Sequence, residues 1–257
     1  MNIGIEVEFT GVKRVSVAEE LGKLWGKGYE SYEYPMFDGT TRLGYHIKDL
    51  TGNTWNIVRD MSIKPDCSRG HITLDYDEYM CELVSPVIRD NEDVDMLKMA
   101  LACICKMGGF VNETCGVHIH IDCPACGEDV YEIFNLVVSS QEKLISDFGI
   151  PYNRLGRYCQ LYPKEFISGM QEWHEVCTKE KGYMSISDIQ KYLYQELGEG
   201  YDRDDPKNPA RYYIFNMDSI HKLNTLEFRW FNSTLSFLII DTYVSKIHEL
   251  LGDMLWR

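Results

Sequence analysis

Basic residues are scarce in this 257-residue chain, which has 26 Lys and Arg against 40 Asp and Glu and a formal net charge of −14. A surface with this balance repels the phosphates of nucleic acids and anionic lipids, so we expect neither as the principal partner. Long hydrophobic runs are also missing, since no apolar stretch approaches the roughly 20 residues of a membrane-spanning helix. With 44% hydrophobic residues, the composition is that of an ordinary globular protein, and we expect a single domain over residues 1–257.

A basic and then apolar leader is absent from the start of the chain, where Glu6 and Glu8 lie in MNIGIEVEFTG. We therefore expect no export and a cytoplasmic location. The sequence has nine cysteines, an odd number in a chain that is too long to need a disulfide scaffold. Mostly free thiols in a reducing compartment are the expectation.

Short periodic segments predict an α+β fold without internal repeats. Alternating apolar and polar residues predict strands at 2–9, 55–60, 79–84, 116–122, 211–217 and 224–231. Helices are predicted at 92–107, at 236–256 and at 16–27, where Ser16 and Glu19 have the spacing of a capping box. A helical insertion is predicted at 128–210, with segments at 128–148, 163–180 and 187–197 and a closing loop at 200–210.

Polar side chains gather on one face of several predicted strands, because alternate residues of a strand point the same way. Glu6 and Glu8 share a face opposite Ile5 and Val7. The same alternation pairs His118 with His120 and Glu227 with Arg229, and Glu82 adds a carboxylate from CELVSP. Taken singly, each pair is typical of a solvated sheet face or a cross-strand ion pair.

A shared concavity would give these polar faces a chemical use. Several carboxylates in one place repel one another without cations, and oxygen ligands suit Mg²⁺ or Mn²⁺. Metal ions held there would bind nucleotide phosphates, and Arg229 would neutralise charge on a transferring phosphoryl group. The residues therefore predict a carboxylate metal site.

A zinc site is the competing interpretation of the segment around the two histidines. Five potential zinc ligands lie within twelve residues: Cys115, His118, His120, Cys123 and Cys126. Thiolates and imidazoles can form a tetrahedral zinc site. Strand alternation, however, points Cys115 away from the histidine face, and the other two cysteines are equally typical of loop thiols.

Six motifs in order resemble the amidoligase family, which is related to glutamine synthetase and glutamate–cysteine ligase. They are GIEVEF (4–9), the tryptophan motif (Trp55, Val58, Asp60, Ser62, Ile63), CELVSP (81–86), CGVHIHID (115–122), RYYIFN (211–216) and TLEFRWFNSTL (225–235). The resemblance implies a glutamine-synthetase-like fold. This is a curved antiparallel sheet with helices packed on its outer face, and its concave face holds the metals.

The resemblance also implies an ATP-dependent ligase that joins a carboxylate to an amine through an acyl phosphate. Glu6 and Glu8 would bind two different Mg²⁺ or Mn²⁺ ions. Glu82 would join the ion of Glu8, whereas His118 and Glu227 would join the ion of Glu6.

The remaining implied roles concern phosphates and substrate. His120 would contact the ATP phosphates and Arg229 would stabilise the transferred phosphoryl group, with Arg211 as a second phosphate contact and Asn216 nearby. Asp60 and Ser62 are substrate-side candidates, and a turn cap is the alternative for both.

Two other functional classes stay open at this stage. A metal-dependent hydrolase could use the same carboxylates and imidazoles to activate water. A catalytically silent ligase fold could serve as a binding module. For the ligase, the expected partners are carboxylate and amine substrates, including peptides or proteins.

Overall fold

The computed structural model describes residues 2–35, 39–66, 76–150, 152–156, 159–196, 209–252 and 254. The chain divides into two compact units. The N-terminal unit comprises Asn2–Ile119 and Phe231–Tyr243, and the central unit comprises His120–Trp230 and Val244–Arg257. Each unit mixes helices with strands, as the α+β prediction requires.

Antiparallel strands form the sheet of the N-terminal unit, in the order β2-β3-β4-β5-β1-β6. The last of them, β6 (Gly116–Asp122), has the predicted bounds, and its residues up to Ile119 belong to this unit. The others are β1 (Ile3–Phe9), β2 (Tyr29–Pro35), β3 (Thr41–Lys48), β4 (Thr54–Val58) and β5 (Cys81–Val84).

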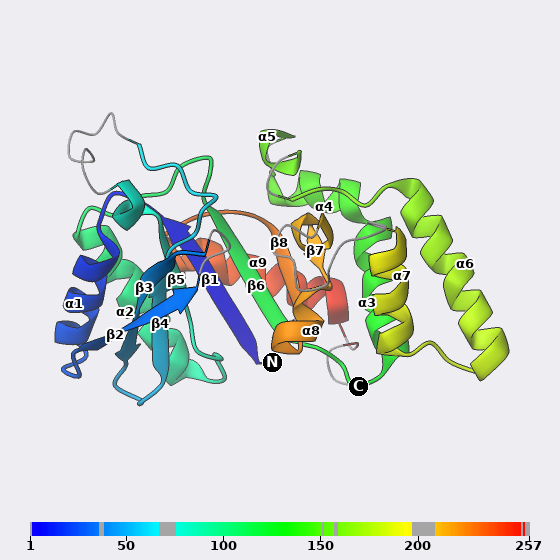
Figure 1. Cartoon of the computed structure of the whole chain (residues 1–257), viewed down its shortest axis with the longest axis horizontal. Coiled ribbons are helices and arrows are strands. Elements are labelled where there is room, and N and C mark those ends of the chain that lie inside the picture. The colour runs from blue at the N-terminus through cyan, green and yellow to red at the C-terminus, as the bar shows by residue number, and fades with distance from the viewer. Residues whose placement is uncertain are drawn as a thin grey trace. The chain divides into compact units, whose positions relative to one another are not determined.

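One face of this sheet is apolar and packs on helix α1 (Arg14–Leu24), as Figure 1 shows. Val7, Leu83 and Ile57 lie directly opposite one another across three strands and are fully buried. The rings of Trp25 and Trp55 lie 5.7 Å apart in the same layer. Because successive side chains alternate, the other face carries the polar residues of these strands, as predicted.

The sequence interpretation missed the hairpin of β2 and β3 and misplaced the start of α1. Strand β2 reads YESYEYP and has polar residues on both faces, so it lacks an apolar period. The capping box of Ser16 and Glu19 was wrong, because α1 begins at Arg14 and Ser16 lies inside it. Lys13 is the N-cap, and its side chain makes no capping hydrogen bond.

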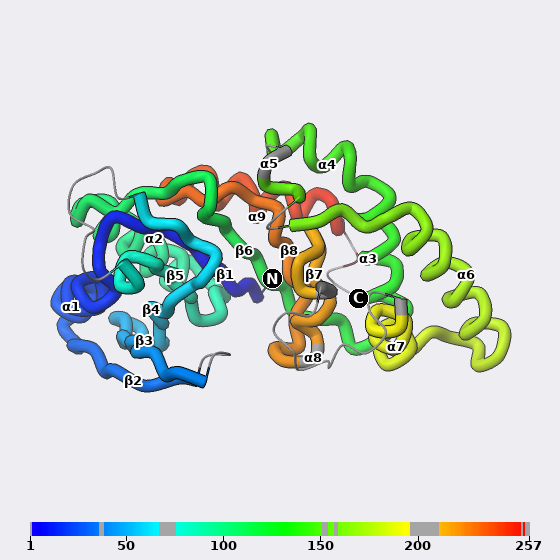
Figure 2. Tube along the Cα trace, turned by 45° about the horizontal axis from the view of Figure 1, so that its top comes forward, coloured from blue at the N-terminus to red at the C-terminus, as the bar shows by residue number. Residues whose placement is uncertain are grey.

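Packed helices make up most of the central unit, and Figure 2 shows α3, α4, α6 and α7 grouped together. The predicted segment 128–148 is two helices that meet at Ser140. The predicted loop at 200–210 lies largely outside the described residues. The helices are α3 (Gly127–Ser139), α4 (Gln141–Phe148), α5 (Tyr152–Leu155), α6 (Lys164–Lys181), α7 (Ile186–Glu196) and α8 (Ser219–Leu223).

Two strands of the central unit carry polar residues beside the end of β6. They are β8 (Thr225–Asn232) and its antiparallel partner β7 (Phe215–Asn216). The predicted strand at 211–217 was too long, because Arg211 lies in a 3₁₀ turn, η3 (Pro209–Tyr212). Tyr162 anchors β7, because its hydroxyl donates to the Phe215 carbonyl at 2.8 Å.

The C-terminal helix α9 (Phe237–Leu251) begins one residue after the predicted start of 236–256, and residues 253, 255 and 256 of that prediction lie outside the described residues. Among the described helices, none is both long enough and apolar enough to cross a lipid bilayer.

Helix α2 (Asn91–Lys106) agrees with its prediction within one residue at each end. The side chain of Asp90 caps this helix by accepting from two backbone amides.

Helix α7 begins with a reciprocal cap between Ser185 and Asp188. The Ser185 amide donates to the Asp188 carboxylate at 3.0 Å, and the Asp188 amide donates to the Ser185 hydroxyl at 3.2 Å. Lys181 also donates to this carboxylate at 2.7 Å. Because Lys181 and Ser185 stabilise the charged form, the pKa of Asp188 falls from 3.8 to about 2.

Replacing Asp188 with Asn should therefore destabilise the protein by about 1 kcal/mol at neutral pH. A carboxylate whose pKa is lowered by folding contributes stability above its unfolded pKa and loses it as the pH falls through the folded value. Urea unfolding should show the full difference above about pH 4 and a vanishing one near pH 2. The exposed pair of Lys143 and Asp147 is the control, and Asp147→Asn should change little. An unchanged Asp188→Asn stability at pH 7 would contradict this role.

Candidate functional site

Two carboxylates face each other across the N-terminal sheet. Glu8 on β1 lies directly opposite Glu82 on β5, and Val58 of β4 is the next residue in the row. Glu8 is only 3% exposed, so water can screen its charge only weakly. Directly opposed like charges destabilise an antiparallel pair. The sheet therefore places here a charge conflict that needs compensation.

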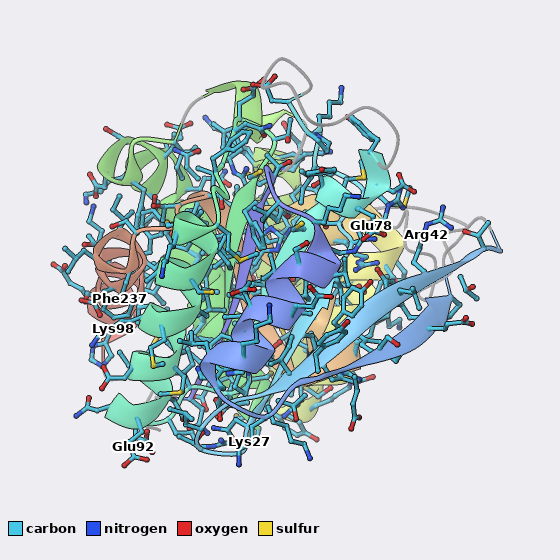
Figure 3. The ribbon with its side chains drawn as sticks, turned by 90° about the vertical axis from the view of Figure 1, so that its left-hand side faces the viewer. Lys27, Arg42, Glu78, Glu92, Lys98 and Phe237 are labelled. Atoms are coloured by element: carbon cyan, nitrogen blue, oxygen red, sulfur yellow. The ribbon has the colours of Figure 1, made fainter. Side chains whose placement is uncertain are left out.

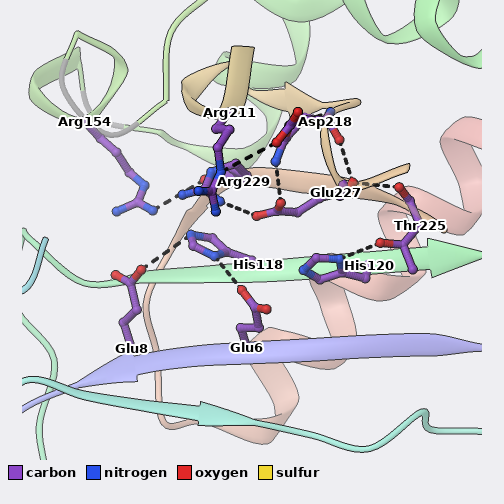
Figure 4. A network of polar contacts seen from close by, with 12 residues as sticks. Glu6, Glu8, His118, His120, Arg154, Arg211, Asp218, Thr225, Glu227 and Arg229 are labelled. Atoms are coloured by element: carbon purple, nitrogen blue, oxygen red, sulfur yellow. Dashed lines mark hydrogen bonds and ion pairs between the residues drawn. The ribbon is translucent and has the colours of Figure 1, made fainter. Parts of the chain in front are cut away.

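His118 lies between the carboxylates of Glu6 and Glu8, as Figure 4 shows. Its Nδ1 is 3.0 Å from Glu6 and its Nε2 is 3.5 Å from Glu8. A neutral imidazole carries one N–H donor and one lone pair, so it can donate to only one of the two carboxylates. A proton or a metal ion at the other nitrogen would satisfy both contacts.

The backbone holds Glu8 in position. The Gly116 amide donates to its Oε2 at 2.6 Å, and the Ser233 hydroxyl donates to its carbonyl at 2.5 Å. Ser233 is itself fixed by its amide, which donates to the Cys115 carbonyl at 3.2 Å. These contacts tie the motif that contains Ser233 to the one that contains Glu8, although more than 200 residues separate them in the sequence.

Two groups of side chains in this unit are close enough to share a metal ion. Glu6, Glu82 and His118 form one group, and each offers a ligand atom within 4.8 Å of the others. The second group, with the same spacing, consists of Glu8, Asp60 and Glu82. Oxygen-rich sets of this kind fit Mg²⁺ or Mn²⁺. The predicted ligands Glu6, Glu8, Glu82 and His118 therefore lie together, with Glu82 common to both groups.

Asp60 and Ser62 are placed differently from each other. The Asp60 Oδ1 accepts from the Ser62 amide at 2.5 Å, which is the turn-capping contact considered from the sequence. Asp60 also belongs to the carboxylate group of Glu8 and Glu82, so it is a metal-ligand candidate that the sequence interpretation assigned to substrate. Ser62 lies in the turn and is in neither group.

Glu227 and Arg229 lie in the central unit, on β8, and form an ion pair of 2.5 Å. The other Glu227 oxygen accepts from the Asn216 amide group at 2.7 Å, and Asn216 is directly opposite Glu227 in the β7–β8 register. Asn216 in turn accepts from the backbone amide of Asp218 at 2.8 Å. These bonds fix the Arg229 guanidinium through a chain of buried polar groups.

Two more arginines of the central unit are near this chain (Figure 4). Arg211 lies 3.7 Å from the buried carboxylate of Asp218, which also accepts from the Tyr194 hydroxyl. Arg154 of α5 is 3% exposed and donates to the Arg229 carbonyl at 3.4 Å. The sequence interpretation missed Arg154 and Asp218, because no local pattern distinguishes them from other charged residues of the helical region and the loops.

His120 is buried, and its Nδ1 lies 2.9 Å from the Thr225 hydroxyl of β8. It is two residues from His118 on the continuous strand β6, so the two imidazoles project from the same strand face. The Thr225 contact sets the orientation of the His120 ring. Both histidines of the motif therefore have fixed rings.

The cysteines do not join these groups. Among the described residues, the sets that could share a metal ion contain no cysteine. Cys115 packs in an apolar cluster with Ile63 and Met80, which agrees with its predicted position away from the histidine face. Burial raises the pKa of Cys123 to about 11, whereas Cys126 is exposed.

The comparisons with known proteins give one finding. A family described as "Putative amidoligase enzyme" matches residues 1–245. The comparisons with curated proteins and with solved structures find no match. The family match covers nearly the whole chain and all six motifs, and these motifs supply the carboxylates, imidazoles and arginines described above. The chain therefore belongs to the amidoligase family, whose members are ligase-type enzymes.

Proposed function

We propose that this protein is an ATP-dependent ligase that joins a substrate carboxylate to a substrate amine. The observation that carries the proposal is the carboxylate face of the N-terminal sheet, where Glu8 opposes Glu82 and His118 contacts Glu6 and Glu8. Family membership supports the ligase class. The carboxylate face is suited to binding a divalent cation, and phosphates are common partners of such cations in proteins.

The proposed reaction forms an amide in two steps. The substrate carboxylate attacks the γ-phosphorus of ATP, and the bond to the β-phosphate oxygen breaks to release ADP. The amine then attacks the acyl phosphate, loses a proton and displaces inorganic phosphate. Both nucleophiles are substrate groups, so the mechanism needs no Ser or Cys nucleophile.

Glu6, Glu8, Glu82 and His118 would hold divalent cations, and Asp60 joins them on the basis of its position. When bound, Mg²⁺ or Mn²⁺ supplies positive charge that neutralises the triphosphate and draws electrons from the γ-phosphorus. Glu8 is well prepared for this role, because the bond from Gly116 fixes one oxygen and leaves the other facing His118.

The central unit would supply the phosphate contacts. Arg229 is held by Glu227, and its planar guanidinium can contact two phosphoryl oxygens at once. The buried carboxylate of Asp218 orients the Arg211 side chain, and the Thr225 hydroxyl orients the His120 ring. Glu227 and Asn216 would orient Arg229, and Glu227 would add a carboxylate to a metal site.

A screen of candidate acids and amines for ADP and phosphate release tests this function. The ligase requires the acid, the amine, ATP and Mg²⁺ together. A hydrolase would turn over with metal alone, and a silent binding module would release no ADP with any pair. Either of those results would overturn the proposed function.

Glu82→Gln should separate charge repulsion from metal binding. Removing one of two opposed charges should raise the melting temperature of the metal-free protein by about 1–2 °C. Mg²⁺ or Mn²⁺ should stabilise the wild type by mass action and the variant much less. The matched control is Glu33→Gln, an exposed strand glutamate of β2 that should leave both quantities unchanged. Equal metal stabilisation in both variants would contradict the assignment of Glu82.

Arg229→Lys should preserve the ion pair with Glu227 but lose the two-pronged contact with phosphate. We expect nearly normal KM for ATP and a loss of kcat on the order of 10²–10³, because such a donor matters most in the transition state. Steady-state kinetics measure both values. A raised KM with unchanged kcat would instead make Arg229 a ground-state contact, and unchanged kinetics would reduce it to a structural ion pair.

Thiol chemistry distinguishes the oxygen-ligated site from the zinc alternative. Iodoacetamide at pH 7.5 should modify the exposed Cys126 much faster than Cys123, since burial raises the pKa of Cys123 to about 11 and the thiolate is the reactive form. Activity should survive modification of Cys126. Loss of activity together with release of one equivalent of zinc would support the Cys/His site.

A further inference from the structure

The polar face of the N-terminal sheet extends beyond the carboxylates. His46 of β3 lies opposite Asn56 of β4, Asn56 opposite Val84 of β5, and Val84 opposite Glu6 of β1. Directly opposed residues share a face, so His46 and Glu6 belong to one row on one face. Three strand spacings of about 4.8 Å separate them, which is roughly 14 Å.

A cavity of about 270 Å³ lies at the His46 end of this row. Its side chains come from Lys27, Glu30, His46, Lys48 and Thr54, and Tyr29 completes the lining with Gly28. This volume is slightly below the range of pockets that enclose a whole small molecule. The cavity therefore suits one end of a longer ligand.

Two neighbours, Tyr32 and Asn56, fix the His46 ring. Tyr32 stacks on it with ring centroids 3.9 Å apart, and Nδ1 lies 2.5 Å from the Asn56 side-chain oxygen. Gly44 permits the stack, because a Cβ there would lie 2.5 Å from the Tyr32 ring. The Asn56 oxygen only accepts, so Nδ1 carries the hydrogen, and in the neutral imidazole Nε2 is then the acceptor. The cavity thus has an oriented acceptor.

The charged side chains that line the cavity indicate the charge of its ligand. Two lysines against one glutamate leave a single positive charge, in a chain whose net charge is −14. This matches one carboxylate better than a doubly charged phosphate. Figure 3 shows Lys27 at the opposite end of the β2–β3 hairpin from Arg42, so the Arg42 charge lies away from this cavity. A carboxylate beside an N–H donor is the chemistry of a peptide C-terminus.

We infer that this cavity binds the C-terminal carboxylate of an extended peptide substrate. Lys27 and Lys48 pair with the carboxylate, and the Nε2 of His46 accepts from the last peptide N–H. At about 3.3 Å per residue, roughly four residues of extended chain reach from the cavity to Glu6. This inference rests on the proposed function only in naming the peptide as its substrate, because binding at the cavity needs neither ATP nor metal.

The test is an amide-resolved NMR titration of the full chain without ATP or divalent metal. The probe is acetyl-tetraalanine with a free C-terminus, and its C-terminal amide and inorganic phosphate are the comparison ligands. We expect saturable shifts of Gly28, Thr54 and His46 with the free acid and at least tenfold weaker binding of the amide. Each of Lys48→Ala and His46→Phe should weaken the free acid about tenfold.

Lys98→Ala is the matched control, because Lys98 is an exposed lysine of the same unit on α2, and binding should be unchanged. Equal affinity for the acid and the amide, tighter binding of phosphate, or unaltered binding by Lys48→Ala and His46→Phe would each overturn the inference. Because no nucleotide is present, such a failure would leave the ligase proposal standing. Conversely, absence of ADP release in the substrate screen would not affect the binding result.

Discussion

Repulsion between Glu8 and Glu82 is the constraint on which the arrangement of the N-terminal unit depends. The two carboxylates are neighbours because β1 pairs with β5 in a register fixed by buried residues on the other face, among them Val7 opposite Leu83. Shifting that register by one residue would expose the apolar row and bury the acids in its place. The hydrophobic layer therefore holds the carboxylates together against their repulsion.

The groups around the acids are arranged to reduce this repulsion. The Gly116 amide and the His118 ring both contact Glu8, and both belong to β6. In the proposed function, divalent cations would complete this compensation. In the central unit buried carboxylates hold positive side chains in place: Glu227 pairs with Arg229, and Asp218 lies beside Arg211.

Strand alternation made the carboxylates, imidazoles and Arg229 predictable from the sequence, because period-two patterns depend only on local geometry. Hairpin β2–β3 was not predictable in this way, since its edge strand is polar on both faces. The position of Asp60 beside Glu8 and Glu82 and the approach of Arg154 to Arg229 result from tertiary contacts between segments far apart in the sequence. The capping box at Ser16 failed because a Ser and a Glu three residues apart occur in helix interiors as well as at helix starts.

The central claim is that carboxylates and His118 bind a divalent cation in the N-terminal unit. Electron spin echo measurements on the Mn²⁺-loaded protein test this claim most directly, because they detect nitrogen nuclei bound to the ion. The account predicts coupling to an imidazole nitrogen that disappears in His118→Ala while Mn²⁺ still binds through the carboxylates. Bound Mn²⁺ without nitrogen coupling in the wild type, or coupling that persists in His118→Ala, would contradict it.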